Sequence, residues 1–148
     1  MKEIAYADLH KYVGQEIGVS DWVEIDQKRV NTFADATGDH QWIHVDVERA
    51  TKEIGGPIAH GYLTLSLIPF LGAQILRTTG VTRGINYGSD KVRFTSMVRV
   101  GKRVRMRQKL LAAEPKSGGL QLRNECTIEI EGEDRPACVA ETLSVIYG

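Results

Sequence analysis

The sequence predicts an α+β domain in which an antiparallel β-sheet wraps around one long, buried α-helix. A mostly apolar stretch from Ile58 to Leu76 repeats its apolar residues at threes and fours and is apolar on nearly all sides, as in a buried helix. From Gly84 onward, apolar and polar residues alternate with the period of strands that have one buried face. A sheet with one wet face around a buried helix is the simplest arrangement that satisfies both patterns.

Short elements are expected before the buried helix. Asp26 is a good N-cap, and Val30, Phe33 and Ala34 after it have helical spacing. The expected elements, in order, are a helix over Tyr6–Tyr12 closed by Gly14, a strand over Ile17–Ile25, a helix from Asp26 to Thr37-Gly38, and a helix over Asp46–Glu53.

The buried helix should follow the break at Gly55-Gly56-Pro57. Pro69 lies inside it and has no N–H to donate, so we expect a bend near Leu65–Ser66.

The second half should form the sheet. Turn signals occur at Pro115–Gly119 and Gly132–Asp134, and a final strand is expected over Ala137–Val145. The cationic side chains of 102–109 recur at every second residue, so they should lie on the wet face of one strand.

Composition excludes several classes of function. The 148 residues fit a single domain over 1–148, and 19 basic residues balance 19 acidic ones. No net field therefore draws the chain to nucleic acid or to an anionic membrane, and no segment resembles a signal peptide or a membrane span. Cys126 and Cys138 lack a CxxC spacing and fit two buried thiols, which suggests the cytoplasm.

Chemically useful side chains concentrate between Phe33 and Asp46. Gly38 allows a sharp turn at a helix exit, and Asp39 and His44 converge if the following loop curls. A carboxylate beside an imidazole can position and activate one water near neutral pH. The same pair also fits a capping or surface hydrogen bond, and the spacing alone leaves both interpretations open.

A second glycine-rich segment, 55–62, opens the buried helix. A helix N-terminus presents unpaired N–H groups and a partial positive charge, which suit a developing oxyanion, and Gly61 would allow a ligand carbonyl to approach closely. Alternatively, these glycines only permit tight packing of the helix on the sheet.

Together these segments resemble a known family. The pattern Phe33-x-x-x-Thr-Gly-Asp-x-x-x-x-His, followed by Gly-Pro-Ile-Ala-His-Gly-Tyr from residue 56, is similar to the signature of MaoC-like (R)-specific enoyl-CoA hydratases. The whole chain resembles the single-domain members related to nodulation protein N, including Val13–Glu16, Asn86–Gly88 and Lys91–Phe94.

This resemblance implies a hot-dog fold, a homodimer or higher oligomer, and reversible hydration of trans-2-enoyl-CoA to (R)-3-hydroxyacyl-CoA without a cofactor. It implies that Asp39 and His44 activate water and that the Gly61 N–H polarises the thioester carbonyl. The substrate pocket is expected to include Gln41, Trp42, His60 and Tyr62. Gln41-Trp42 stands where members often have Asn-Pro, and Pro69 stands where some have serine, so chain-length preference is the property these departures affect most.

Other functions fit the residues less well. Asp39 with His40, His44 and His60 lacks a recognised metal-ligand spacing, so no metal is expected. A hot-dog acyl-CoA thioesterase and a non-catalytic acyl-CoA-binding protein are the remaining alternatives.

Overall fold

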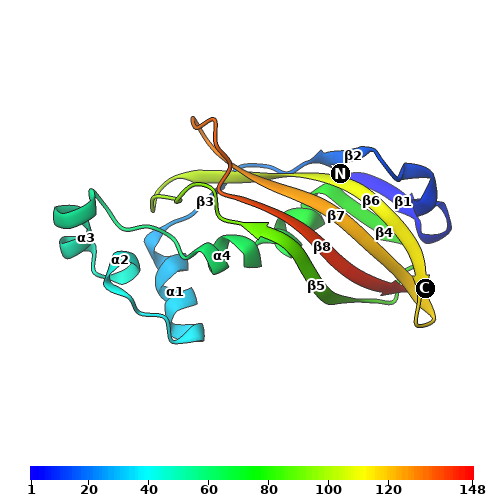
Figure 1. Cartoon of the computed structure of the whole chain (residues 1–148), viewed down its shortest axis with the longest axis horizontal. Coiled ribbons are helices and arrows are strands. Elements are labelled where there is room, and N and C mark those ends of the chain that lie inside the picture. Colours follow the sequence, from blue (N-terminus) through cyan, green and yellow to red (C-terminus); the bar gives the residue numbers. More distant parts are fainter.

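The computed structural model describes residues 1–148 and has the expected antiparallel sheet with a central helix against it (Figure 1). Its elements, in chain order, are β1 (Lys2–Ala5), η1 (Tyr6–Tyr12), β2 (Glu16–Val19), β3 (Val23–Glu24), α1 (Gln27–Thr37), α2 (Trp42–Val45), α3 (Val47–Ile54), α4 (Gly61–Ser66), α5 (Ile68–Ile75), β4 (Leu76–Thr79), β5 (Arg83–Arg93), β6 (Arg103–Lys116), β7 (Gly119–Ile130) and β8 (Cys138–Tyr147).

The main sheet is antiparallel, with the strand order β2-β6-β7-β8-β5 and with β3 also paired to β6. The β6–β7 hairpin closes through Ser117 and Gly118, whose φ angles of 51° and 80° are both positive. Two consecutive positive φ values suit the right-handed twist of the flanking strands. The predicted turn at Pro115–Gly119 is therefore confirmed.

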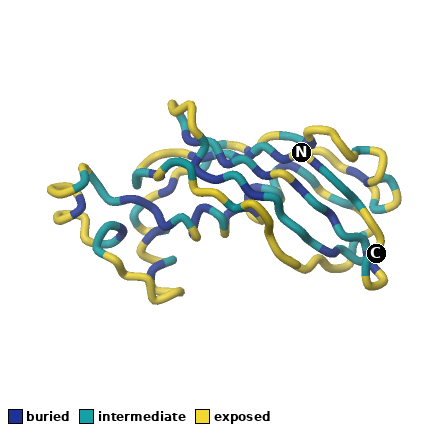
Figure 2. The backbone as a smooth tube through the Cα atoms, in the orientation of Figure 1, coloured by how far each residue is buried: buried dark blue, intermediate teal, exposed yellow.

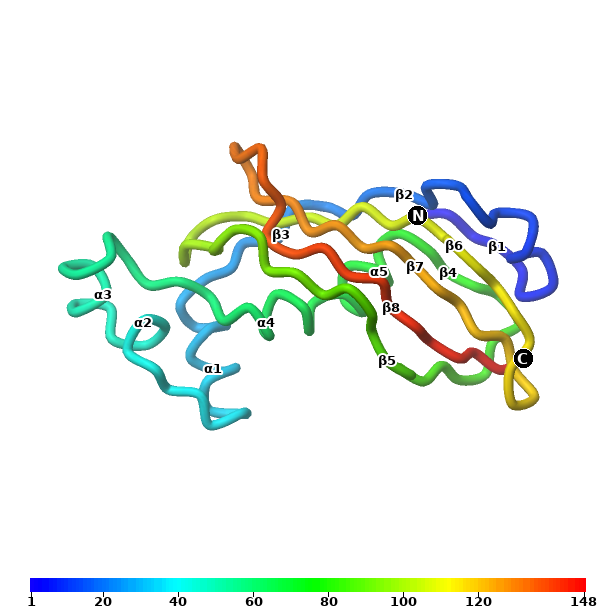
Figure 3. Tube along the Cα trace, viewed as in Figure 1, coloured from blue at the N-terminus to red at the C-terminus, as the bar shows by residue number.

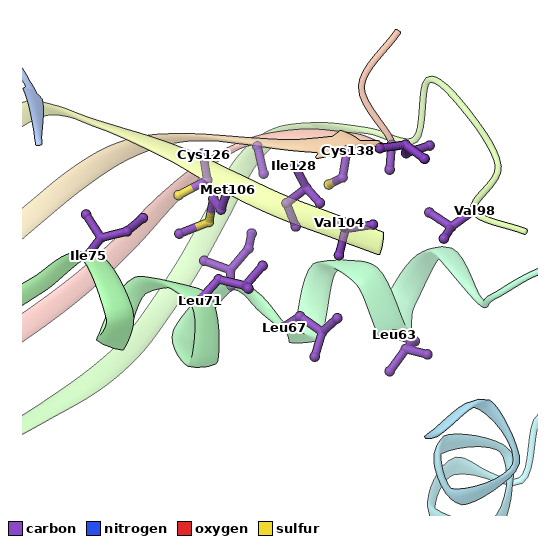
Figure 4. Close-up of a cluster of buried hydrophobic side chains, with 14 of the residues drawn as sticks. Leu63, Leu67, Leu71, Ile75, Val98, Val104, Met106, Cys126, Ile128 and Cys138 are labelled. Carbon is purple, nitrogen blue, oxygen red and sulfur yellow. The ribbon is translucent and has the colours of Figure 1, made fainter. Parts of the chain in front are cut away.

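The core lies between the central helix and the inner face of the sheet (Figure 4). Leu71 of α5, Met106 of β6 and Ile128 of β7 are fully buried there, and Met106 pairs directly with Ile128 across the two strands. The alternating strand pattern thus points every second strand side chain toward the central helix, as the sequence predicts. The outer face of β6 carries the cationic residues, which pair with neighbouring acidic side chains.

The central helix is broken as expected. The segment α4 ends at Ser66 and α5 begins at Ile68, with Pro69 in its first turn, where a missing N–H costs no helical hydrogen bond. The expectation that this helix is buried on most of its sides is wrong in part, because Tyr62 is 69% exposed and Phe70 is 48% exposed.

Local capping residues act as the sequence predicts. The Asp26 carboxylate accepts a hydrogen bond from the Arg29 N–H at 2.8 Å, and Gly38 ends α1 with a φ of 84°. The Asp46 carboxylate likewise accepts from the Arg49 N–H at 3.1 Å and caps α3.

Three local expectations need correction, and one long-range pairing was not foreseen. The predicted strand over 17–25 is divided because Ser20 turns its hydroxyl onto β6, where it accepts from the Met106 N–H at 2.9 Å. The expected loop over 39–46 contains the helical turn α2, and the opening helix η1 is a 3-10 helix. The parallel pair of β1 with β4 was not predicted, since it joins segments more than seventy residues apart.

The strand β5 forms one edge of the main sheet and is exposed at all of its residues except Val92 (Figure 2). At the end of the molecule where α4 begins, α1, α2 and α3 extend beyond the sheet (Figure 3). None of the helices has the length and hydropathy that crossing a membrane requires.

Candidate active site

The segment between α1 and α3 curls so that Asp39 and His44 meet. Gly38 reverses the chain, and the Gln41 carbonyl then accepts a hydrogen bond from the His44 N–H at 3.0 Å. The Gln41 N–H in turn donates to the Asp39 carboxylate at 3.3 Å. These short-range bonds supply the curl that the sequence interpretation required.

The His44 side chain is buried, with 7% of its surface exposed, and its orientation is fixed. Its Nδ1 lies 2.6 Å from the Ile58 carbonyl oxygen. Because a carbonyl oxygen only accepts, Nδ1 must carry the proton, and Nε2 of the neutral ring is left with a lone pair. Burial lowers the pKa of His44 below its usual 6.5, although the hydrogen bond to Ile58 opposes this shift. The ring is therefore neutral and basic at Nε2 near neutral pH.

His60 forms the second wall of the site. Its Nε2–H donates to the Asp39 backbone carbonyl at 3.0 Å, and its ring stacks on His44 with centroids 3.8 Å apart and planes at 24°. Phe33 packs on the same ring at 4.9 Å. The Nδ1 atom of His60 is buried without a hydrogen-bond partner. His60 thus holds the Asp39 backbone and the His44 ring together.

One carboxylate oxygen of Asp39, one ring nitrogen of His44 and one ring nitrogen of His60 all lie within 4.8 Å of one another. A gap of this size between a carboxylate oxygen and a ring nitrogen can be bridged by one water with ordinary hydrogen bonds of about 2.7–3.2 Å. These three groups are also the ones that could hold a metal ion, although Nδ1 of His44 and Nε2 of His60 already bond carbonyl oxygens.

His40 is not part of this cluster. It pairs with Asp35 at 2.9 Å on the exposed surface, and the hydrogen bond to that carboxylate raises the pKa of His40. The chain therefore contains two Asp–His pairs with a five-residue spacing, one solvated and one at the buried cluster.

Gly61 is the first residue of α4, so its N–H has no partner within the helix. A Cβ built on Gly61 would lie 3.1 Å from the Phe94 ring. The packing interpretation of this glycine therefore has direct support, and it is compatible with an unpaired N–H at the same residue.

The remaining predicted pocket residues differ in position. Trp42 lies under the Arg49 guanidinium, 4.1 Å from the ring centroid, so it is held against α3. Tyr62 points to the surface and meets Phe94 edge-on at 5.9 Å. Gln41 is exposed at the start of α2.

Sequence reasoning missed two supports of the site. Gln27 donates from Nε2 to the His44 carbonyl at 2.8 Å, across seventeen residues, and no spacing signal points to it. Phe33 belongs to the family-like motif, but its contact with His60 could not be read from the motif alone.

Comparison with known proteins supplies a family context. Residues 8–124 match the family model described as MaoC like domain. The chain is 51% identical over 139 residues to 3-hydroxyacyl-thioester dehydratase Z of Mycobacterium tuberculosis, covering 93% of this chain and 92% of that protein. It is 45% identical to nodulation protein N of Rhizobium leguminosarum bv. viciae, covering 99% of this chain and 93% of that protein.

Solved structures share the fold. The R-hydratase PhaJ1 of Pseudomonas aeruginosa has a TM-score of 0.77 at 25% identity, covering 96% of this chain and 84% of that one. The (R)-hydratase from A. caviae involved in PHA biosynthesis has a TM-score of 0.72 at 25% identity, covering 89% of this chain and 94% of that one. The architecture is therefore the hot-dog fold of these hydratases.

Proposed function

This chain belongs to the MaoC-like dehydratase family, and on that premise we propose that it hydrates trans-2-enoyl-CoA to (R)-3-hydroxyacyl-CoA and catalyses the reverse dehydration. The observation that carries the proposal is the state of His44. Its Nδ1–H is tied to the Ile58 carbonyl, so a basic Nε2 is available beside the Asp39 carboxylate. A fixed neutral base next to an acceptor-only carboxylate suits the binding and activation of one water.

In the proposed reaction, Asp39 and His44 hold the water, and its oxygen bonds to C3 of the substrate as Nε2 of His44 takes a proton. The electron pair of the C2–C3 double bond moves toward the thioester oxygen. The Gly61 N–H at the start of α4 stabilises that developing negative charge. The proton taken by His44 is then returned to C2 on the same face, so one water is added and no cofactor or metal is required.

Spectrophotometry tests this proposal. Purified protein should remove the conjugated thioester absorbance of crotonyl-CoA, and the product should be the (R) isomer by a stereospecific dehydrogenase assay. Asp39→Asn and His44→Gln should each lower kcat by at least about 10²-fold, because each removes an acid–base group. Unchanged rates in both variants would show that the pair does not carry the reaction.

The exposed pair offers a matched control. Asp35→Asn and His40→Gln remove an Asp–His pair of the same spacing that lies outside the buried cluster. Both should keep the wild-type kcat. A loss in these controls as large as in the Asp39 and His44 variants would mean that the assay reports damage to the α1–α3 region and not the chemistry.

Two other outcomes would replace the hydratase proposal. Release of free thiol from saturated acyl-CoA would indicate a thioesterase. Calorimetric binding of enoyl-CoA without turnover would indicate an acyl-CoA-binding protein.

We also propose that the protein is a homodimer in which β5 strands of two copies lie edge to edge. The outer edge of β5 has no partner strand, and Ile85 and Tyr87 on it are 52% and 57% exposed. An exposed, partly apolar edge is a surface that a second strand can pair with. The exposed Tyr62, Phe94 and Met97 add apolar surface that such a partner could cover.

Sedimentation equilibrium measures this directly. The wild type should have twice the chain mass, and Ile85→Lys should have the mass of one chain. Val19→Lys on β2, the strand at the opposite edge of the main sheet, should remain dimeric. A monomeric wild type would exclude the dimer.

The free, buried Cys126 and Cys138 support our expectation that the protein works in the reducing cytoplasm.

A further inference from the structure

A cavity of about 580 Å³ lies between the central helix and the inner face of the sheet, on the side of β5. Its helix wall includes Leu65, Pro69 and Gly72. This volume falls within the usual range of small-molecule pockets, about 300–1,000 Å³. None of Asp39, His44 or His60 lines it, so the cavity lies further along the helix than the Asp39–His44 site.

One wall of this cavity is polar where the rest of the inner sheet face is apolar. Four of its residues form a row across neighbouring strands: Asn124 of β7 pairs with Thr142 of β8, Thr142 pairs with Ser89 of β5, and Gln108 of β6 donates from Nε2 to the Asn124 Oδ1 at 3.1 Å. All four line the cavity, and we call them the polar row. Apolar residues could fill the same inner-facing strand positions, so packing alone does not explain why these four side chains are polar.

The two amides of the polar row have unused hydrogen-bonding groups. Gln108 and Asn124 are each only 8% exposed, and their mutual bond uses one donor and one acceptor. The Gln108 Oε1 and the Asn124 amide nitrogen have no protein partner. If both amides were flipped, one donor and one acceptor would still be left. Neither unpaired atom is fully enclosed by protein, so both face the cavity, where water can bond them. A plain acyl chain that displaces this water would leave the two amides unpaired, which costs free energy, whereas a polar ligand group can replace the water.

The lining also restricts the charge of the ligand. No Asp, Glu, Lys, Arg or His lines the cavity, so a charged ligand group would be left without a counter-charge. A hydroxyl, a carbonyl or an amide can instead use both a donor and an acceptor without that penalty.

The position of the row along the helix sets the size of the ligand. Gly72, whose Cβ position is 3.5 Å from the Gln108 Oε1, follows Gly61 by eleven residues. A helix rise of about 1.5 Å per residue puts the two glycines at most about 16 Å apart, because the bend between α4 and α5 shortens the straight-line distance. An extended chain covers about 3.5 Å per three bonds, so about 16 Å corresponds to at most about 14 bonds.

We propose that the polar row recognises an uncharged hydrogen-bonding substituent, a hydroxyl or a carbonyl, near the far end of a long acyl chain whose thioester lies at Gly61. This inference rests on the proposed function for the placement of the thioester, and it adds the substrate class. An oxygenated long-chain acyl thioester is preferred over the plain chain of equal length.

Two substrates of equal length provide the test. We compare trans-2-dodecenoyl-CoA with 12-hydroxy-trans-2-dodecenoyl-CoA and take the ratio of their kcat/KM values. A site whose buried polar groups need a partner should favour the hydroxylated chain by at least about tenfold, whereas a purely apolar pocket would favour the plain chain. Equal values, or a preference for the plain chain, would overturn the inference.

Variants of the row locate the effect. Asn124→Leu with Gln108→Met replaces both amides by apolar groups of similar size and should reverse the preference. Thr142→Val is a milder change that should shift the ratio in the same direction if the double variant does not fold. Thr127→Val, on the outer face of β7, should leave the ratio unchanged. If neither row variant moves the ratio relative to this control, the row does not recognise the substituent.

A binding measurement separates this inference from the proposed function. Calorimetry with dodecanoyl-CoA and 12-hydroxydodecanoyl-CoA needs no turnover. If neither crotonyl-CoA nor either twelve-carbon enoyl-CoA is hydrated but the hydroxylated thioester binds about tenfold more tightly, the hydratase proposal fails and the recognition site stands. If hydration occurs but both thioesters bind equally well, only the recognition site fails.

Discussion

The substitutions Gly61→Ala and Gly72→Ala add the same methyl group at two points of the central helix and should have opposite effects on stability. At Gly61 the new Cβ would lie 3.1 Å from two Phe94 ring carbons and 3.2 Å from a third, so the ring must move. Overpacking of this kind costs about 1–3 kcal/mol, and the higher helix propensity of alanine offsets part of that cost. We expect Gly61→Ala to lower the free energy of unfolding by about 1 kcal/mol.

At Gly72 the nearest atoms to the new Cβ are the Gln108 Oε1 at 3.5 Å and the Met106 Cε at 3.7 Å, which are ordinary contacts. Replacing a glycine inside a helix by alanine stabilises by about 0.5–1 kcal/mol, because the unfolded glycine has more conformational freedom. The two variants should therefore differ by about 2 kcal/mol.

Urea unfolding measures both variants, with equal m-values as the check that both unfold from the same native state. Adding Phe94→Leu to Gly61→Ala should restore most of the lost stability, because it removes the ring that the methyl group meets. On the proposed mechanism, the double variant should also recover activity lost in Gly61→Ala, since a displacement of about 1 Å at an N–H that stabilises the oxyanion can cost about 10²-fold in rate. A Gly61→Ala protein as stable as Gly72→Ala would refute the packing argument.

Four further results are expected. Because burial lowers the pKa of His44, kcat/KM should stay constant at neutral pH and fall only along an acidic limb below 6.5. The same depressed pKa means that the unfolded chain binds this proton more readily, so the free energy of unfolding should fall as pH drops from 6.5 through the folded pKa of His44, as acid titration of stability would record. His60→Gln keeps an amide donor for the Asp39 carbonyl but removes the stacked ring that helps to bury His44, and burial is the main cause of the lowered His44 pKa. The acidic limb of the pH–rate profile should therefore move to higher pH. Leu71→Ala, at a fully buried position, should lower the free energy of unfolding by about 2–5 kcal/mol in urea titrations. Burial raises the pKa of Cys126 and Cys138 to about 11, so both thiols should resist alkylation in the native protein and react once it is unfolded, as mass spectrometry would show.

The sequence predicted those parts of the candidate site that depend on residues only a few positions apart in the chain. The turn at Gly38 and the five-residue separation of Asp39 and His44 indicated that the pair converges if the loop curls, and the structure has this curl. The expectation that Tyr62 helps to form the pocket stays a prediction; within one chain its side chain points to solvent. Whether a second copy covers it depends on the oligomer and not on any short-range pattern.

Sequence by itself determined the elements whose causes lie within a few residues: the cap at Asp26, the break at Pro69 and the alternating strands. Backbone preferences, capping bonds and side-chain periodicity act over that range. Only the tertiary structure decided which nitrogen of His44 is basic, because the carbonyl that fixes its proton belongs to Ile58, fourteen residues away. It also decided that polar residues from four strands meet beside Gly72. Contacts of this kind depend on the register of the whole sheet, which no single segment of the chain encodes.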